Sequence, residues 1–157
     1  MIQIQKINNK PFFKFIIENF KFFKPLELRW NDLDPIGHVN NVFYFVYYQI
    51  GRAYYMLDAS KQWDWTKHMF VIAHMECDYQ KELTLTAINP KVGLRVTKFG
   101  TKSFEFEYII TSTNRKGENV IHAIGKSTQV MIDMQQGKSI ELPEWLVDDF
   151  KQYEPNI

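Results

Sequence analysis

The distribution of apolar and polar positions predicts one long helix in the first half of the chain. Over residues 41–58, apolar side chains recur at helical spacing and tyrosines cover much of the remaining surface. The apolar stripe consists of Phe43, Val46, Ile50, Ala53, Tyr54 and Leu57, and the tyrosines are Tyr44, Tyr47, Tyr48 and Tyr55. A helix that is apolar nearly all round is expected to be buried on most sides. Asn40 or Asn41 is suited to cap its first turn.

The segments around this helix have the pattern of β-strands. The predicted strands span residues 26–30, 70–79, 91–99, 103–113 and 119–133. The alternation is clearest in the fourth, where Phe104, Phe106, Tyr108 and Ile110 share one face. Glu105 and Glu107 lie on the opposite face, so we expect this strand to have one buried side and one polar side.

Turn-forming residues connect the predicted strands. Residues 100–102 and 114–117 predict two hairpin turns. Residues 142–150 predict a short closing helix with Pro143 in its first turn. The order of a strand, a helix and then hairpin-linked strands indicates an α+β fold, with an antiparallel sheet against one helix.

The N-terminal segment has a pattern of its own. Residues 11–23 read PFFKFIIENFKFF, with Phe13, Ile16, Ile17, Phe20 and Phe23 at helical spacing. The segment is too interrupted to span a bilayer and has no signal-peptide cleavage site. An amphipathic helix or extended arm packed on the body or on a partner is favoured over attachment to a membrane surface. We therefore divide the chain into an amphipathic extension, residues 1–23, and one domain, residues 24–157.

Composition narrows the functional classes. The 157 residues are 45% hydrophobic and 24% charged, as expected of one globular domain. The 16% aromatic content suggests a packed subunit interface or an apolar pocket. A net charge of +1 argues against nucleic acid as a partner. The single cysteine, Cys77, and the lack of a secretory signal or membrane-spanning stretch lead us to expect a cytoplasmic protein.

Several familiar motifs are incomplete. His74-Met75-Glu76 has the H-x-E form of zinc deaminases, but no P-C-x-x-C follows it. Two G-K-S stretches, at 125–127 and 137–139, lack the earlier glycine of a phosphate loop. No G-x-S-x-G occurs, and the four histidines lack ligand spacing. We therefore expect no metal and interpret Cys77 as a structural thiol.

The loop before the predicted helix carries the most chemistry. Residues 32–41 read DLDPIGHVNN, which places Asp34 on a tight loop leading to a helix N-terminus. The free N–H groups there can stabilise an oxyanion, and a carboxylate beside them can attack a carbonyl or activate water. Pro35 and Gly37 allow the required bend. Taken alone, however, these residues are better explained as helix caps and turns.

A family resemblance selects between these interpretations. The stretch RWNDLDPIGHVNNVFYF, residues 29–45, resembles the signature of hotdog-fold acyl-CoA thioesterases of the 4-hydroxybenzoyl-CoA thioesterase type. The likeness extends over residues 26–145 and implies an antiparallel sheet wrapped around one long central helix. It also implies that Asp34 is the catalytic carboxylate, as nucleophile or general base, and that the amide of Asn41 is the oxyanion donor. Asp32 is assigned a structural role.

The resemblance further implies contacts with the substrate. Lys102 and Ser103 match a K-S-F turn that contacts coenzyme A in one branch of the family. Gly37 and His38 belong to the G-H-V-N-N loop, in which the histidine is expected to fix the loop by a hydrogen bond. Phe43, Phe45 and Tyr47 are candidates to line an acyl pocket, although such rings are more often core.

Beyond these motifs, one residue departs from the family pattern and one pair matches it. Gln49 stands where many relatives carry an acid in the middle of the helix. We interpret this position as structural; if the acid orients water in some relatives, Asp34 acts alone here. Asp78-Tyr79 matches a recurrent pair on the strand after the helix.

The expected partners are an acyl-CoA substrate and other copies of the chain. The resemblance implies a homodimer that pairs into a homotetramer, with sites at subunit interfaces and no cofactor. Three alternatives remain open: a hotdog dehydratase, an acyl-carrier-protein thioesterase, and a non-catalytic protein that binds acyl thioesters. The acyl group is not determined by these residues.

Overall fold

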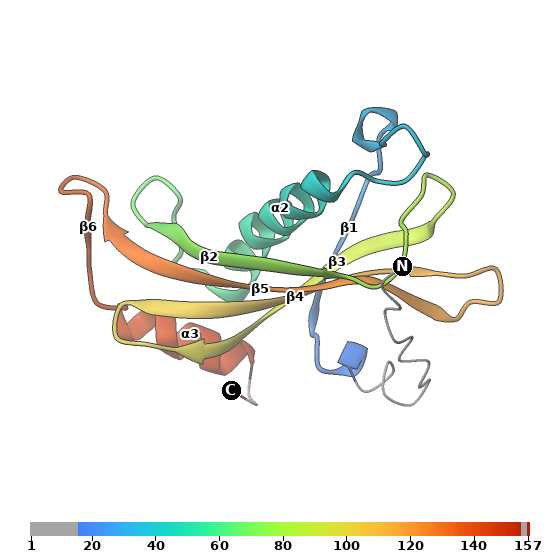
Figure 1. The fold of residues 1–157 in the computed structure, drawn as a ribbon. Coiled ribbons are helices and arrows are strands. Elements are labelled where there is room, and N and C mark those ends of the chain that lie inside the picture. Colours follow the sequence, from blue (N-terminus) through green and yellow to red (C-terminus); the bar gives the residue numbers. More distant parts are fainter. Residues whose placement is uncertain (1–15, 155–156) are drawn as a thin grey trace.

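One curved antiparallel sheet forms the body of the computed structural model, which describes residues 16–154 and 157 (Figure 1). The strands are β1 (Phe22–Pro25), β2 (Met69–Tyr79), β3 (Ile88–Phe99), β4 (Ser103–Thr113), β5 (Asn119–Asp133) and β6 (Lys138–Ser139). Their order across the sheet is β1-β3-β4-β5-β2, and β6 pairs with β5. Helix α2 (Asn41–Ala59) lies along one face, and α3 (Glu144–Tyr153) closes one end.

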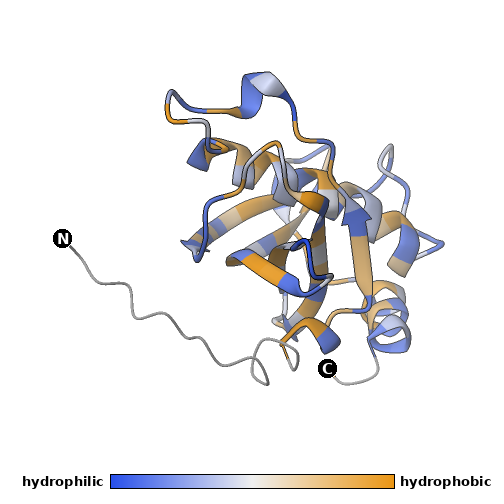
Figure 2. Ribbon diagram, turned by 90° about the vertical axis from the view of Figure 1, so that its right-hand side faces the viewer, coloured by the Kyte–Doolittle hydropathy of each residue, from blue (hydrophilic) through white to orange (hydrophobic). Residues whose placement is uncertain are grey.

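The alternation predicted for β4 is confirmed. Phe104, Phe106, Tyr108 and Ile110 are fully buried. On the opposite face Glu105 pairs with Lys98 and Glu107 pairs with Arg95 on the neighbouring strand β3. Hydrophobic and hydrophilic positions accordingly alternate along the strands in Figure 2. Helix α2 thus packs on the apolar face of the central strand β4.

Helix α2 buries its tyrosine side rather than most of its circumference. Its tyrosines 44, 47, 48 and 55 are at most 3% exposed, whereas Ile50, Tyr54 and Leu57 of the predicted stripe are 37–49% exposed. Burial on most sides was therefore a wrong prediction. The tyrosine side can enter the core because its hydroxyls find partners, as Tyr47 does with Asp32 and Tyr55 with Glu154.

The helix also approaches the sheet closely at one glycine. A Cβ atom added to Gly51 would lie 2.4 Å from the Leu94 side chain on β3. A larger residue at this position would require the Leu94 and Val92 side chains on β3 to shift.

The first strand was predicted in the wrong place. β1 is formed by Phe22–Pro25 rather than residues 26–30, and it pairs with β3. The ladder ends with a bond from the Leu26 amide to the Pro90 carbonyl. Beyond it, hydrogen bonds between Arg29 and Asp32 turn the chain into a short 3-10 helix, Trp30–Asp32, so the apolar alternation there does not form a strand.

The predicted N-terminal extension is only partly described. Its residues 1–15, which include Phe13 and the start of the predicted helix, lie outside the described residues. Residues 16–18 are helical, and Phe20 packs against Ile109 and Ile121 on the sheet face away from α2. The boundary drawn after residue 23 falls inside β1. Among the described residues, no helix is long and apolar enough to cross a membrane.

The closing helix α3 begins two residues later than predicted. It spans Glu144–Tyr153, and Pro143 is its N-cap. Ser60, at the end of α2, donates a hydrogen bond of 2.5 Å to Asp149. The ring of Phe150 stacks with that of Phe99 at a centroid distance of 6.2 Å. These contacts close the end of the molecule farthest from the start of α2 (Figure 1).

Candidate functional site

The loop before α2 holds Asp34 in one orientation. Its Oδ1 atom accepts hydrogen bonds from the amides of Ile36 and His38, both at 3.0 Å. The Asp34 amide in turn donates to the His38 carbonyl at 2.8 Å. Gly37, with a φ of +80°, provides the left-handed residue that this turn requires. Among the described residues no partner contacts Oδ2, so the second carboxylate oxygen is available for chemistry.

Asp32, two residues earlier, is fully buried and bonded on both oxygens. It receives hydrogen bonds from the backbone and side chain of Arg29, at 3.0 and 3.1 Å, and from Tyr47 at 2.8 Å. Burial opposes the charge of Asp32, but these bonds outweigh it and hold the pKa of the carboxyl below its usual value. Asp32 therefore anchors the loop to the body, in keeping with a structural role.

The first turn of α2 presents a free amide beside Asp34. The Asn40 side chain caps the helix by accepting from the Val42 amide at 3.1 Å, and the Phe43 amide bonds to the Asn40 carbonyl. Within the described part of the chain, the Asn41 amide donates to no acceptor. Because it lies at the positive end of the helix, it is suited to bind a carbonyl oxygen.

Asp34 and Asn41 open onto the same cavity, which has a volume of about 370 Å³. Its lining residues are Asp34, His38, Val39, Asn41, Tyr44, Tyr79, Gln80, Lys81 and Glu82. The Tyr79 hydroxyl donates to the Asn41 carbonyl at 3.1 Å, and its ring meets that of Tyr44 edge to face. The geometry therefore brings together a carboxylate, a helix-start amide and two aromatic walls.

Part of this cavity was not anticipated from the sequence. Residues 80–82, which follow β2, form one wall. Tyr79 belonged to a recognised Asp-Tyr pair but had been assigned no role. The strand pairing of β2 with β5 brings this wall to the Asp34 loop, and no local signal in residues 80–82 indicates it.

The other residues of the loop and helix that were predicted to contact the substrate do not all line the Asp34 cavity. His38 lines the cavity, but its backbone fixes the loop, and its ring makes no hydrogen bond to a described residue. Tyr47 is 1% exposed, bonds to Asp32 and borders a separate hollow with Lys24 and Tyr54. Phe43 packs beneath the Arg29 guanidinium, outside the Asp34 cavity.

Lys102 and Ser103 lie at the opposite end of the sheet. Lys102 Nζ bonds to Ser139 at 3.4 Å. Thr111, which pairs with Ile121 near the cavity, is separated from Ser103 along β4 by about 27 Å, at about 3.4 Å per residue. Within one chain the fold therefore does not bring this pair to Asp34.

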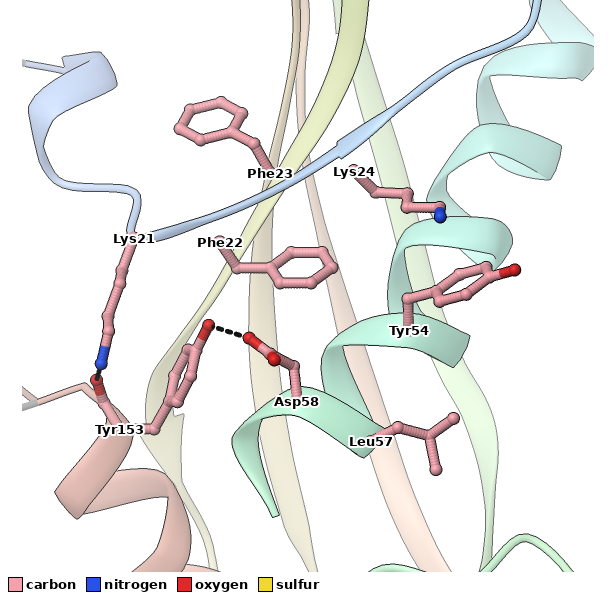
Figure 3. Close-up of a pocket in the computed structure, with 8 residues that line it drawn as sticks. All are labelled: Lys21, Phe22, Phe23, Lys24, Tyr54, Leu57, Asp58 and Tyr153. Carbon is pink, nitrogen blue, oxygen red and sulfur yellow. Dashed lines mark hydrogen bonds between the residues drawn. The ribbon is translucent and has the colours of Figure 1, made fainter. Parts of the chain in front are cut away.

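A further cavity, of about 410 Å³, lies between β1, α2 and α3 (Figure 3). The Tyr153 hydroxyl donates to Asp58 at 2.5 Å, and Lys21 donates to the Tyr153 carbonyl at 3.2 Å. The Lys24 ammonium lies 3.8 Å from the centre of the Tyr54 ring. Figure 3 shows the Asp58 carboxylate bonded to the Tyr153 hydroxyl, and among the described residues no helix-start amide lines this cavity.

The described residues contain no group of three or more His, Cys, Asp or Glu side chains that could hold a metal. Cys77 is half-buried and lies 3.3 Å from the Tyr48 hydroxyl. Burial raises the pKa of its thiol, which disfavours the reactive thiolate. Among the described residues, Asp34 has a carboxylate oxygen without a partner, and the nearby Asn41 amide at the start of α2 donates to no acceptor.

Comparison with known proteins identifies the family of the chain. Residues 28–150 match the model of the thioesterase-like superfamily. A thioesterase from Thermus thermophilus, in complex with coenzyme A and Zn, is 30% identical, with a TM-score of 0.76 over 89% of this chain and 98% of that one. A mutant 4-hydroxybenzoyl-CoA thioesterase, in complex with 4-hydroxybenzoyl-CoA, has a TM-score of 0.73 over 82% and 97% of the two chains. At 13% identity, this second likeness shows a shared fold.

A relative without an assigned activity is also similar. The uncharacterized protein YsmA of Bacillus subtilis is 25% identical over 122 residues, which is 78% of this chain and 80% of that protein. The family match spans most of the described residues and includes the Asp34 loop. The curved antiparallel sheet against a long helix confirms the expected hotdog fold. The chain therefore belongs to the thioesterase-like superfamily and is a hotdog-fold thioester hydrolase.

Proposed function

We propose that the protein hydrolyses acyl-CoA thioesters to a free acid and coenzyme A, with Asp34 as its catalytic carboxylate. The observation that carries this proposal is the Asp34 carboxylate, fixed through one oxygen and free at the other, beside the unpaired Asn41 amide. The complexes of two structural relatives with coenzyme A or an acyl-CoA support the choice of substrate. No step requires a metal or an organic cofactor.

In the proposed reaction the thioester carbonyl oxygen accepts the Asn41 N–H, which stabilises the negative charge that develops there. Asp34 acts in one of two ways. As a nucleophile, its Oδ2 forms a bond to the carbonyl carbon, the carbon–sulfur bond breaks, and water then hydrolyses the mixed anhydride. As a general base, it takes a proton from the attacking water and returns that proton to the departing thiolate.

The active unit is proposed to be a homodimer that pairs into a tetramer, with each site at a subunit interface. β2 is an edge strand, and its Val71, Ile72 and Tyr79 are 38–47% exposed. An exposed apolar edge favours pairing with a second copy. Lys102 and Ser103, distant from Asp34 in their own chain, are proposed to contact coenzyme A at the site of another subunit. Residues 1–23 are proposed to form an extension of this domain.

The first test removes the negative charge of Asp34 but keeps the shape of its side chain. Asp34→Asn keeps a side-chain oxygen for the Ile36 and His38 amides, so folding should be retained while thiol release falls at least a thousandfold. Asp133→Asn is the matched control, because Asp133 Oδ1 also accepts two amides, from Gln135 and Gln136, at 2.8 Å. Release of coenzyme A is followed with a thiol reagent. Near-normal activity of Asp34→Asn would refute the assignment.

The substrate is tested with a panel of aliphatic and aromatic acyl-CoA thioesters and an acyl-carrier-protein thioester. We expect thiol release from the coenzyme A esters. Binding without release would instead identify an acyl-thioester binding protein. Water addition to an unsaturated acyl chain would identify a dehydratase.

A further inference from the structure

His122 is a buried residue of β5 that the proposed reaction does not use. It is 4% exposed and sits where the pairing of β5 with β4 changes register. Ala123 pairs with Ile110 and Ile121 pairs with Thr111, so His122 is the extra residue of a β-bulge. Bulges re-aim side chains and occur frequently beside active sites.

The bulge directs both the backbone and the ring of His122 at the wall of the Asp34 cavity. The His122 carbonyl accepts from the amides of Gln80 at 2.8 Å and Lys81 at 3.2 Å. Its Nδ1 atom lies 2.9 Å from the Glu82 carbonyl and 3.3 Å from that of Lys81. Every residue of the wall 80–82 thus bonds to His122.

The ring has one tautomer that satisfies these partners. Nδ1 faces two carbonyl oxygens, so it carries the proton and donates. Nε2 lies 2.7 Å from the Ser112 hydroxyl, which donates to it. Burial lowers the pKa of the imidazole, which favours this neutral form.

The wall is in turn bonded to the catalytic loop. Leu83, the next residue and fully buried, accepts the Val39 amide at 2.8 Å through its carbonyl. Val39 directly follows His38, whose amide and carbonyl hold Asp34. His122 is therefore linked to the Asp34 loop by two hydrogen bonds, one to the Glu82 carbonyl and one from the Val39 amide to the Leu83 carbonyl, with Glu82 and Leu83 adjacent in the chain.

We infer that His122 is a positioning residue of the thioester site, which holds the wall 80–82 and, through Leu83, the Asp34 loop in register with the Asn41 amide. This inference rests on the proposed function. A shift of the reacting groups by about 1 Å can reduce turnover about a hundredfold. Loss of the bond from Nδ1 to Glu82 is thus expected to reduce kcat more than it changes KM.

Two isosteric substitutions separate the two ring bonds. In His122→Asn the amide nitrogen takes the place of Nδ1 and can still donate to Glu82, while the partner of Ser112 is lost. In His122→Gln the terminal amide takes the place of Nε2 and can still bond to Ser112, while the donor to Glu82 is lost. Ser112→Ala removes the Ser112 bond alone. Melting temperatures establish whether the stabilities of these variants are comparable.

The expected result is a fall in kcat of at least tenfold for His122→Gln, with kcat within about threefold of the unmodified protein for His122→Asn and Ser112→Ala. Hydrogen exchange at the Val39 amide should be faster in His122→Gln than in His122→Asn. Equal kcat for the two His122 variants would overturn the inference, because a merely structural role predicts equal effects from equal numbers of lost bonds.

One further readout depends neither on the folding of a variant nor on thioester turnover. Nitrogen-15 NMR of the unmodified protein should show His122 protonated on Nδ1, and the Nε2-protonated tautomer would overturn the inference. If the unmodified protein releases no thiol from any thioester, the proposed function fails. The exchange rate at Val39 would then still decide whether His122 holds the loop.

Discussion

Asp32 and Asp34 are two residues apart, yet the folded chain gives their carboxylates different surroundings. Asp32 is fully buried and bonded through both oxygens to Arg29 and Tyr47. Asp34 is bonded through one oxygen and lines a cavity. A carboxylate whose oxygens are all engaged stabilises a fold, whereas one with a free oxygen can react. Hydrogen-bond occupancy therefore distinguishes the two acids, which the D-x-D pattern alone does not.

The neutral state of His122 should make stability depend on pH. Burial lowers the pKa of its imidazole, and the Lys81 charge acts in the same direction, whereas the carbonyls of Glu82 and Lys81 and the Glu82 charge oppose it. The unfolded chain binds a proton at this residue below about pH 6.5 and the folded chain resists it. We therefore expect the free energy of unfolding to fall as the pH decreases from 7.5 to 5.

Urea denaturation at the two pH values measures this effect. His122→Asn serves as the control, because it lacks the titrating group and should lose less stability over the same interval. An identical loss in both proteins would show that other groups cause the pH dependence.

At the scale of the elements, a cap fixes the start of α2. The Asn40 side chain accepts the Val42 amide at 3.1 Å. Asn40→Ala removes this acceptor and should lower the free energy of unfolding by about 1 kcal/mol, as measured by urea denaturation. Asn40→Ser retains a capping oxygen and should remain within a few tenths of a kcal/mol of the original stability. Equal stability of Asn40→Ala and the unmodified protein would contradict the assignment of this cap.

The strands and turns after α2 were predictable because their signals are local. Strong alternation in β4 and turn residues at 100–102 and 114–117 determined which residues pair. β1 was misplaced because the apolar alternation of residues 26–30 competes with hydrogen bonds that Asp32 makes to Arg29. The buried face of α2 was misjudged because tyrosine can enter a core only where its hydroxyl finds a partner, and those partners come from other elements.

The candidate site was predictable where its residues lie close together in the sequence. Asp34, Gly37 and Asn41 belong to one short stretch, DPIGHVNN, so a single family motif was sufficient to indicate them. The wall 80–82 and its support by His122 arise from pairing between β2 and β5 and from a one-residue bulge. A single sequence carries no periodic signal for either, because both depend on residues that are distant along the chain.

At the scale of the whole molecule, the edge strand β2 is where a second copy is expected to pair. Val71→Glu places a charge on this apolar edge and should raise the dissociation constant of the dimer at least tenfold, measured by sedimentation velocity. Met134→Glu is the matched control, because Met134 is 48% exposed and Val71 is 47% exposed. Met134 lies in the turn after β5, beyond the residues that pair with β2. A dimer unaffected by Val71→Glu would contradict pairing through β2.

Pairing through the exposed β2 edge would make the activity of the protein depend on its concentration. If two chains complete each site, the fraction of active sites rises with the concentration of the chain, by mass action. At concentrations below the dissociation constant of the pair, halving the amount of protein would lower total activity by more than half. Expression level would then set both the number of sites and the fraction of them that are complete.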